Sequence, residues 1–123
     1  MKPKIYPSRE TFTSLAQGAN LIPIYREILA DTETPIRVFK TLDTEPYAFL
    51  LESVQGGERW SRYSFMGMAP MLIFQSKATR VRIECDGKTQ ELEVEDPLRL
   101  LKTTLAAYRP TSVEGLPRFF GGA

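Results

Sequence analysis

The clearest hydrophobic pattern in the chain is the alternation of polar and apolar residues between positions 79 and 95. Asp86-Gly87 supplies the two residues that adopt positive φ in a type I′ turn. A hairpin closed there has three cross-strand pairs: Arg82 with Glu91, Arg80 with Glu93, and Val81 with Leu92. One face is then charged and the other largely apolar, as in a half-buried sheet. The pattern therefore predicts strands over 79–85 and 88–95 in this register.

Segments rich in β-branched and aromatic residues predict further strands before this hairpin. The expected strands are Tyr47 to Val54, Arg59 to Met68 and Met71 to Gln75, the first two joined by a turn at 55–58. Ala69-Pro70 separates the second from the third. Leu21 to Ile28 also has strand composition, with Pro23 indicating a sheet edge or a strand start. The strands from 47 to 95 predict an antiparallel β-meander.

Three helices are predicted from capping residues followed by apolar residues at helical spacing. Ser8 caps the first helix, which has Phe12, Leu15 and Ala16 on one face and ends near Gly18. Thr34-Pro35 opens the second, with Ile36, Phe39 and Leu42 on one face. Asp96-Pro97 opens the third, with a stripe of Leu98, Leu101 and Leu105, and Arg109-Pro110 ends it. The expected fold class is α+β, with helices flanking the meander.

Composition and charge narrow the possible functions. The 123 residues fit one domain over 1–123, and 42% hydrophobic with 25% charged residues is typical of a folded domain. A net charge of +1 gives no electrostatic indication of a nucleic-acid or membrane partner. One cysteine and no apolar leader favour the cytoplasm. The absence of histidine removes the commonest general base and most zinc sites.

Three weaker candidate sites have simpler structural interpretations. Gly56-Gly57 lacks the strand-to-helix setting and the lysine of a phosphate-binding loop, so a hairpin turn is favoured. Glu91, Glu93 and Glu95 could bind a metal, but they share the strand face that is expected to pair with arginines. Cys85 has an acidic neighbour and no histidine, so a structural role is favoured.

A more informative polar cluster lies on two neighbouring predicted strands. It comprises Leu51, Glu52, Ser53, Arg62, Tyr63 and Ser64. The carboxylate of Glu52 could bind an ammonium group, and a nearby donor could bind a carboxylate, so the cluster could hold a zwitterion such as an amino acid. From the residues alone, a hairpin with outward-facing polar side chains explains the same segment. At this level the hairpin interpretation is favoured, because convergence of the polar groups on one pocket is not visible in the sequence.

Several longer segments resemble anthranilate synthase component I, a family of chorismate-using enzymes. They are Asn20 to Ile28 followed by Asp31 and Glu33-Thr34-Pro35, then Phe49 to Val54, Gly56 to Trp60, Arg62 to Phe65, and Leu116 to Ala123. The resemblance covers nearly the whole chain in the family's order and spacing. It implies that the chain forms part of one side of a large two-sheet α/β sandwich.

The resemblance also implies an activity and a regulator. The whole enzyme would convert chorismate and ammonia, with Mg²⁺, to anthranilate and pyruvate, and a glutamine amidotransferase subunit would supply the ammonia. L-Tryptophan would inhibit it from a separate pocket, where Ser53 contacts the ligand, flanked by Glu52 and Leu51. Arg62, Tyr63 and Ser64 would line or support that pocket. The family's catalytic and Mg²⁺-binding residues lie beyond residue 123, so this chain by itself is expected to lack catalysis and bound metal.

Two other functions fit part of the same pattern. Component I of aminodeoxychorismate synthase, in the folate pathway, shares much of this front region and differs in its product. A free-standing small-molecule binding or interaction module is the third possibility. The ending Phe119-Phe120-Gly121-Gly122 is typical of the entrance to another buried strand, which favours a longer protein. Strand edges and apolar faces left uncovered predict self-association of this chain.

Overall fold

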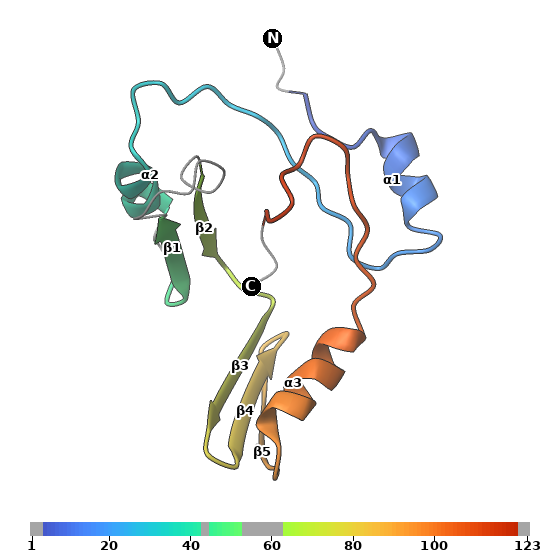
Figure 1. Cartoon of the computed structure of the whole chain (residues 1–123), viewed down its shortest axis with the longest axis vertical. Helices are drawn as coiled ribbons and strands as arrows, with labels where there is room; N and C mark the ends of the chain where they lie inside the picture. Colours follow the sequence, from blue (N-terminus) through green and yellow to red (C-terminus); the bar gives the residue numbers. More distant parts are fainter. Residues whose placement is uncertain (1–3, 43–44, 53–62, 121–123) are drawn as a thin grey trace. The chain divides into compact units, whose positions relative to one another are not determined.

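The computed structural model describes residues 4–42, 45–52 and 63–120. These residues form three helices and five strands, which confirms the α+β class (Figure 1). They belong to two compact units, one made of Met1–Ile28 with Met71–Leu116 and the other of Leu29–Pro70 with Pro117–Ala123. Within the described ranges, the helices are too short and too polar to cross a membrane.

The first unit contains a three-stranded antiparallel sheet in the order β3-β4-β5. The strands are β3 (Leu72–Lys77), β4 (Arg80–Cys85) and β5 (Lys88–Glu93). The register of β4 and β5 confirms all three predicted pairs: Arg82 with Glu91, Arg80 with Glu93, and Val81 with Leu92. The turn residues Asp86 and Gly87 have φ of 51° and 72°, as a type I′ turn requires. Val81 on the apolar face is 2% exposed.

Helix α3 (Pro97–Ala106) follows this sheet and begins where the sequence predicts. The Asp96 side chain accepts a hydrogen bond from the backbone N–H of Arg99 at 3.0 Å. The predicted stripe is wrong in part, because Leu98 and Leu105 are 76% and 53% exposed. The half-buried positions are instead Pro97, Leu100, Leu101, Thr104 and Tyr108. These recur every three or four residues, so the inward face is rotated toward Leu100 and leaves Leu98 and Leu105 outside.

Helix α1 (Arg9–Leu15) is capped by Ser8, whose hydroxyl accepts from the backbone N–H of Thr11 at 3.2 Å. The segment after it, Leu21 to Ile28, is not the strand that its composition predicts. It makes only two isolated bridges to other described residues, Leu21 with Pro110 and Tyr25 with Tyr6. Single bridges of this kind do not form a continuous ladder.

Tyr25 connects three parts of the first unit. Its backbone exchanges two hydrogen bonds of 2.8 Å with Tyr6, and the two rings stack at 5.2 Å between centroids. Its hydroxyl donates to the carbonyl oxygen of Glu114 at 2.7 Å. Gly115, with φ of 91°, lies against that hydroxyl, where a β-carbon would collide with it. A single side chain thus joins the chain's beginning to residues 114–115.

The second unit contains α2 (Pro35–Leu42) and a two-stranded antiparallel sheet of β1 (Ala48–Glu52) and β2 (Ser64–Met68). The Thr34 hydroxyl caps α2 by accepting from the backbone N–H of Arg37 at 3.2 Å. On α2, Phe39 is half-buried as expected, whereas Ile36 and Leu42 are 53% and 42% exposed. The predicted turn at 55–58 lies outside the described residues.

The strands divide between two sheets, so the predicted meander is interrupted after β2. Ala69 has φ of 50° and Pro70 has no backbone N–H to donate. A residue with positive φ followed by proline cannot continue a ladder. β2 therefore ends at Met68, and β3 begins in the other unit at Leu72.

Candidate functional site

The β1–β2 hairpin positions four of the six candidate residues. Its register places Glu52 opposite Ser64 and Leu51 opposite Phe65. Tyr63 directly precedes β2 and its ring stacks on Phe65, with centroids 6.0 Å apart. Ser53 and Arg62 lie outside the described residues. The described candidates therefore occupy one end of the hairpin, beside the segment that joins its strands.

The hairpin separates these four side chains onto its two faces. Directly opposed residues share a face, and side chains alternate along each strand. Leu51 therefore lies on the Phe65 face, and the ring stacking places Tyr63 there as well. Glu52 and Ser64 lie together on the other face. One face of the hairpin thus has a carboxylate beside a hydroxyl. The other face has a leucine beside two aromatic rings.

The aromatic face is the better-formed of the two. Phe119 packs edge-on against Phe65, with centroids 4.9 Å apart and an interplanar angle of 76°. This is a preferred geometry for aromatic pairs. Leu51 and Tyr63 remain 52% and 48% exposed, so this face has apolar surface open to a ligand or a covering segment. Phe119 was missed as a site residue, although the Phe119-Phe120 pair was the signal that could have indicated it.

A glycine allows close packing on the same face. Gly67 lies opposite Phe49, two residues along each strand from the Leu51–Phe65 pair. The Phe49 ring covers Gly67 so closely that a β-carbon there would overlap the ring. The ring therefore packs against the hairpin at Gly67, and the aromatic face continues from Tyr63 to Phe49.

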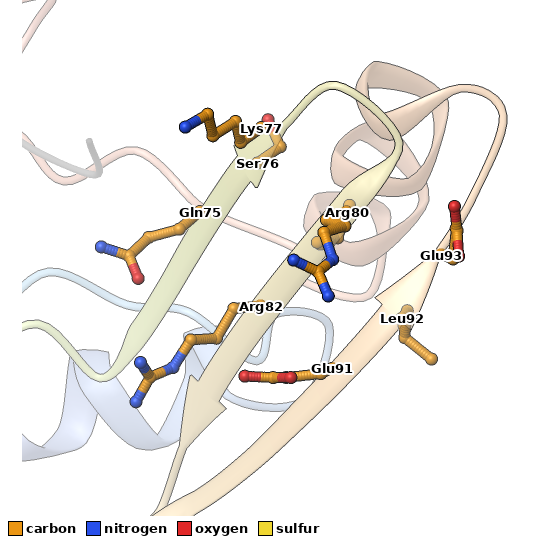
Figure 2. A pocket seen from close by; sticks show the side chains of 9 residues that line it. Gln75, Ser76, Lys77, Arg80, Arg82, Glu91, Leu92 and Glu93 are labelled. Carbon is orange, nitrogen blue, oxygen red and sulfur yellow. The ribbon is translucent and has the colours of Figure 1, made fainter.

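The first unit has a polar groove of about 430 Å³ across its three-stranded sheet. Figure 2 shows its lining residues, which are Gln75, Ser76, Lys77, Arg80, Val81, Arg82, Glu91, Leu92 and Glu93. The predicted ion pair of Arg82 with Glu91 is replaced by one within β4, because Arg82 contacts Glu84 at 2.7 Å. Glu93 accepts from the Thr79 hydroxyl at 3.2 Å.

The groove and the single cysteine both have simpler structural interpretations. The polar side chains that line the groove are exposed and carry both charges, which is typical of a solvated surface, whereas Val81 is buried and Leu92 half-buried. Across the described ranges, no three His, Cys, Asp or Glu side chains are placed to hold a metal ion, and this includes Glu91, Glu93 and Glu95. Cys85 is half-buried at the end of β4. The hairpin of the second unit therefore remains the candidate site.

Known proteins match the chain along nearly its whole length. It is 43% identical over 117 residues to anthranilate synthase component 1 of Pseudomonas aeruginosa, covering 94% of this chain and 24% of that protein. It is 39% identical over 119 residues to anthranilate synthase component 1 of Acetivibrio thermocellus, covering 96% of this chain and 24% of that protein. The chain is similar to the N-terminal quarter of anthranilate synthase component 1.

A third relative matches the chain over a similar length. The anthranilate synthase component 1 of Synechocystis is 40% identical over 120 residues, covering 96% of this chain and 23% of that protein. The chain thus spans about a quarter of the length of the anthranilate synthase components that it matches. No protein-family model matches it, and no solved structure matches it.

Proposed function

We propose that this chain is the tryptophan-sensing part of an anthranilate synthase component 1. The similarity to proteins of that name over 94–96% of the chain supports the proposal. In this proposal, the whole protein converts chorismate and ammonia to anthranilate and pyruvate, with ammonia delivered by a glutamine amidotransferase subunit. The chain contributes regulation, and the residues that act on chorismate belong to the remaining three quarters.

The aromatic face of the β1–β2 hairpin supports a role in binding an aromatic amino acid. Leu51 and Tyr63 are each about half exposed beside Phe65, a surface on which an indole ring can pack. We assign the amino-acid end of tryptophan to Ser53 and Arg62. Serine hydroxyl and guanidinium groups both donate hydrogen bonds to a carboxylate.

The opposite face of the hairpin has a supporting role in this proposal. Glu52 and Ser64 face each other there, and they neighbour residues 53 and 62 in the sequence. The Glu52 carboxylate would attract the ligand's ammonium group at the end of the hairpin, where the two faces meet. The assignment therefore uses all six candidate residues, of which Ser53 and Arg62 lie outside the described part of the chain.

Magnesium and catalysis are assigned outside this chain. In the described ranges no group of three His, Cys, Asp or Glu side chains is placed to hold a metal ion, and we derive no step through Mg²⁺. Inhibition would require tryptophan to bind better to a state of the whole protein that binds chorismate poorly, and the coupling would be reciprocal. A difference of a few kcal/mol between the binding free energies of tryptophan for the two states would produce inhibition. About 5.5 kcal/mol would make the switch between the states nearly complete.

Calorimetric titration of L-tryptophan into this chain, with L-phenylalanine as the control ligand, tests the sensing function. We expect saturable heat for tryptophan alone, and we expect Ser53→Phe to abolish it by filling the pocket. Ser14→Phe, which adds the same side chain to an exposed position of α1, is the matched control and should leave binding unchanged. Equal heats for the two amino acids would contradict the assignment of a tryptophan pocket.

A chimera tests the role in the whole protein. In it, this chain replaces the matching 117 residues of the Pseudomonas aeruginosa relative. We expect the chimera to form anthranilate from chorismate and ammonia, with inhibition by tryptophan. Ser53→Phe should retain the activity and remove the inhibition. Unchanged inhibition in that variant would show that Ser53 lies outside the pocket.

A further inference from the structure

Among the described residues, the segment Leu21 to Ile28 makes backbone hydrogen bonds at two positions, Leu21 and Tyr25. Leu21 donates to Arg109 and accepts from Thr111, and Tyr25 donates to and accepts from Tyr6. In extended chain, alternate residues direct their N–H and C=O groups to opposite sides. Leu21 and Tyr25 are four residues apart, so extended backbone between them directs both bonded residues to the same side.

The other side of the segment is an open edge. It is formed by Ile22, Ile24, Arg26 and Ile28, and no backbone bond joins these four to other described residues. Pro23 is the one residue of the segment without an N–H, and its odd position places that missing donor on the bonded side. Every residue of the open edge therefore has both a donor and an acceptor.

The same four residues carry an apolar stripe. Their side chains share one face because they alternate along the segment, and three of the four are isoleucine. Ile24 and Ile28 are 63% and 72% exposed. An edge that combines free backbone groups with exposed β-branched side chains is a template for another strand. This also explains why the composition of the segment is that of a strand although the ladder is incomplete.

We propose that the Ile22–Ile28 edge binds a β-strand from the part of anthranilate synthase component 1 that follows this region in its relatives. The relatives are about four times as long as the matched segment, so most of each protein is available to supply that strand. The added strand has apolar residues at alternate positions, to cover Ile24 and Ile28. This inference rests on the proposed place of the chain in a longer protein, and it assigns a structural interface that is independent of tryptophan binding.

Amide hydrogen exchange in the isolated chain and in the chimera tests this interface. We expect the amides of Ile24, Arg26 and Ile28 to exchange roughly tenfold or more slowly in the chimera, because a new ladder protects them. The Tyr25 amide, already bonded to Tyr6, and those of β4 are internal references. Equal exchange of the three edge amides in the chain and in a folded chimera would overturn the proposal. Protection that appears only as the concentration of the isolated chain rises, with no added protection in the chimera, would overturn it in favour of a second copy.

A matched pair of variants separates the two sides of the segment. Arg26→Pro removes a donor from the open edge, and Glu27→Pro removes one from the bonded side. We expect Arg26→Pro to lower the melting temperature of the chimera more than Glu27→Pro does, and the reverse order would contradict the interface. If the chimera does not fold, exchange at the aligned residues of the Pseudomonas aeruginosa relative gives the same test. Loss of anthranilate formation or tryptophan inhibition with edge protection retained would contradict the proposed function alone.

Discussion

At the scale of single residues, Gly67 permits the closest packing in the β1–β2 hairpin. The Phe49 ring occupies the space that a β-carbon would need, whereas Gly18 has nothing within 4 Å of that position. We expect Gly67→Ala to destabilise the second unit by about 1–3 kcal/mol through overpacking. Urea unfolding followed by aromatic circular dichroism measures this. Gly18→Ala is the control and should be much milder. Equal effects of the two substitutions would show that the contact with Phe49 is not maintained.

Tyr25 gives the first unit a predicted dependence on alkaline pH. Desolvation, followed by the charge of Glu27, raises the pKa of its phenol above the ordinary value of 10.0. Folding therefore favours the neutral phenol, which donates to the Glu114 carbonyl oxygen. This contribution is complete below pH of about 10 and is lost as the pH rises through the higher folded-state pKa.

Paired measurements isolate this titration from those of the other tyrosines. We expect the stability of the chain to fall less steeply above pH of about 10 in Tyr25→Phe than in the unsubstituted chain. Difference absorbance of the two proteins gives the phenol pKa, and urea midpoints at each pH give the stability. Tyr47→Phe, at an exposed position of the second unit, is the control. Parallel pH profiles for the unsubstituted chain and Tyr25→Phe would contradict this prediction.

At the scale of elements, α3 depends on a local cap. Asp96 accepts from the Arg99 N–H, and Pro97 occupies the first helical turn. Asp96→Ala should cost about 1 kcal/mol, the usual value of an N-cap hydrogen bond. Circular dichroism at helical wavelengths during urea unfolding measures it. Glu95→Ala removes a neighbouring exposed carboxylate that makes no cap. A loss of equal size in Glu95→Ala would indicate a general charge effect.

The elements that the sequence predicts correctly are those determined by near neighbours. The Asp86-Gly87 turn sets the β4–β5 register within a few residues, and Ser8, Thr34 and Asp96 cap helices by contacts three positions away. Leu21 to Ile28 and the inward face of α3 were predicted less well, because their partners are distant in sequence. The segment meets Tyr6 and Pro110 only at single residues.

In the candidate site too, the features determined by near neighbours were predictable from the sequence, and those determined by distant partners were not. Neighbouring strands around residues 51–52 and 63–64 could be expected from composition, and the structure places them side by side. The separation of Leu51 from Glu52 depends on strand alternation and the register. The Phe119-Phe120 pair indicates an apolar segment, but the contact of Phe119 with Phe65, more than fifty residues away in the sequence, could not be predicted from it.

At the scale of the whole molecule, both units expose large hydrophobic side chains. Val81 is the one buried hydrophobic residue among the described positions. Ile24, Ile28 and Leu98 of the first unit are each more than 60% exposed. Surfaces of this kind are usually covered by further protein. The similarity to a quarter of anthranilate synthase component 1 gives the same expectation from an independent direction.

The outer face of α3 leads to a prediction for the isolated chain. Leu98 and Leu105 are seven residues apart, so they lie on the same helix face, and both are exposed. We expect the chain to self-associate at high concentration, and Leu98→Glu with Leu105→Glu to shift it toward the monomer. Sedimentation velocity over a concentration series measures the change. Lys102→Glu alters charge on the same face without removing apolar surface, and should leave association largely unchanged. A chain that stays monomeric at every concentration would show that these leucines are tolerated as isolated exposed residues, and that the open strand edge does not pair with a second copy either.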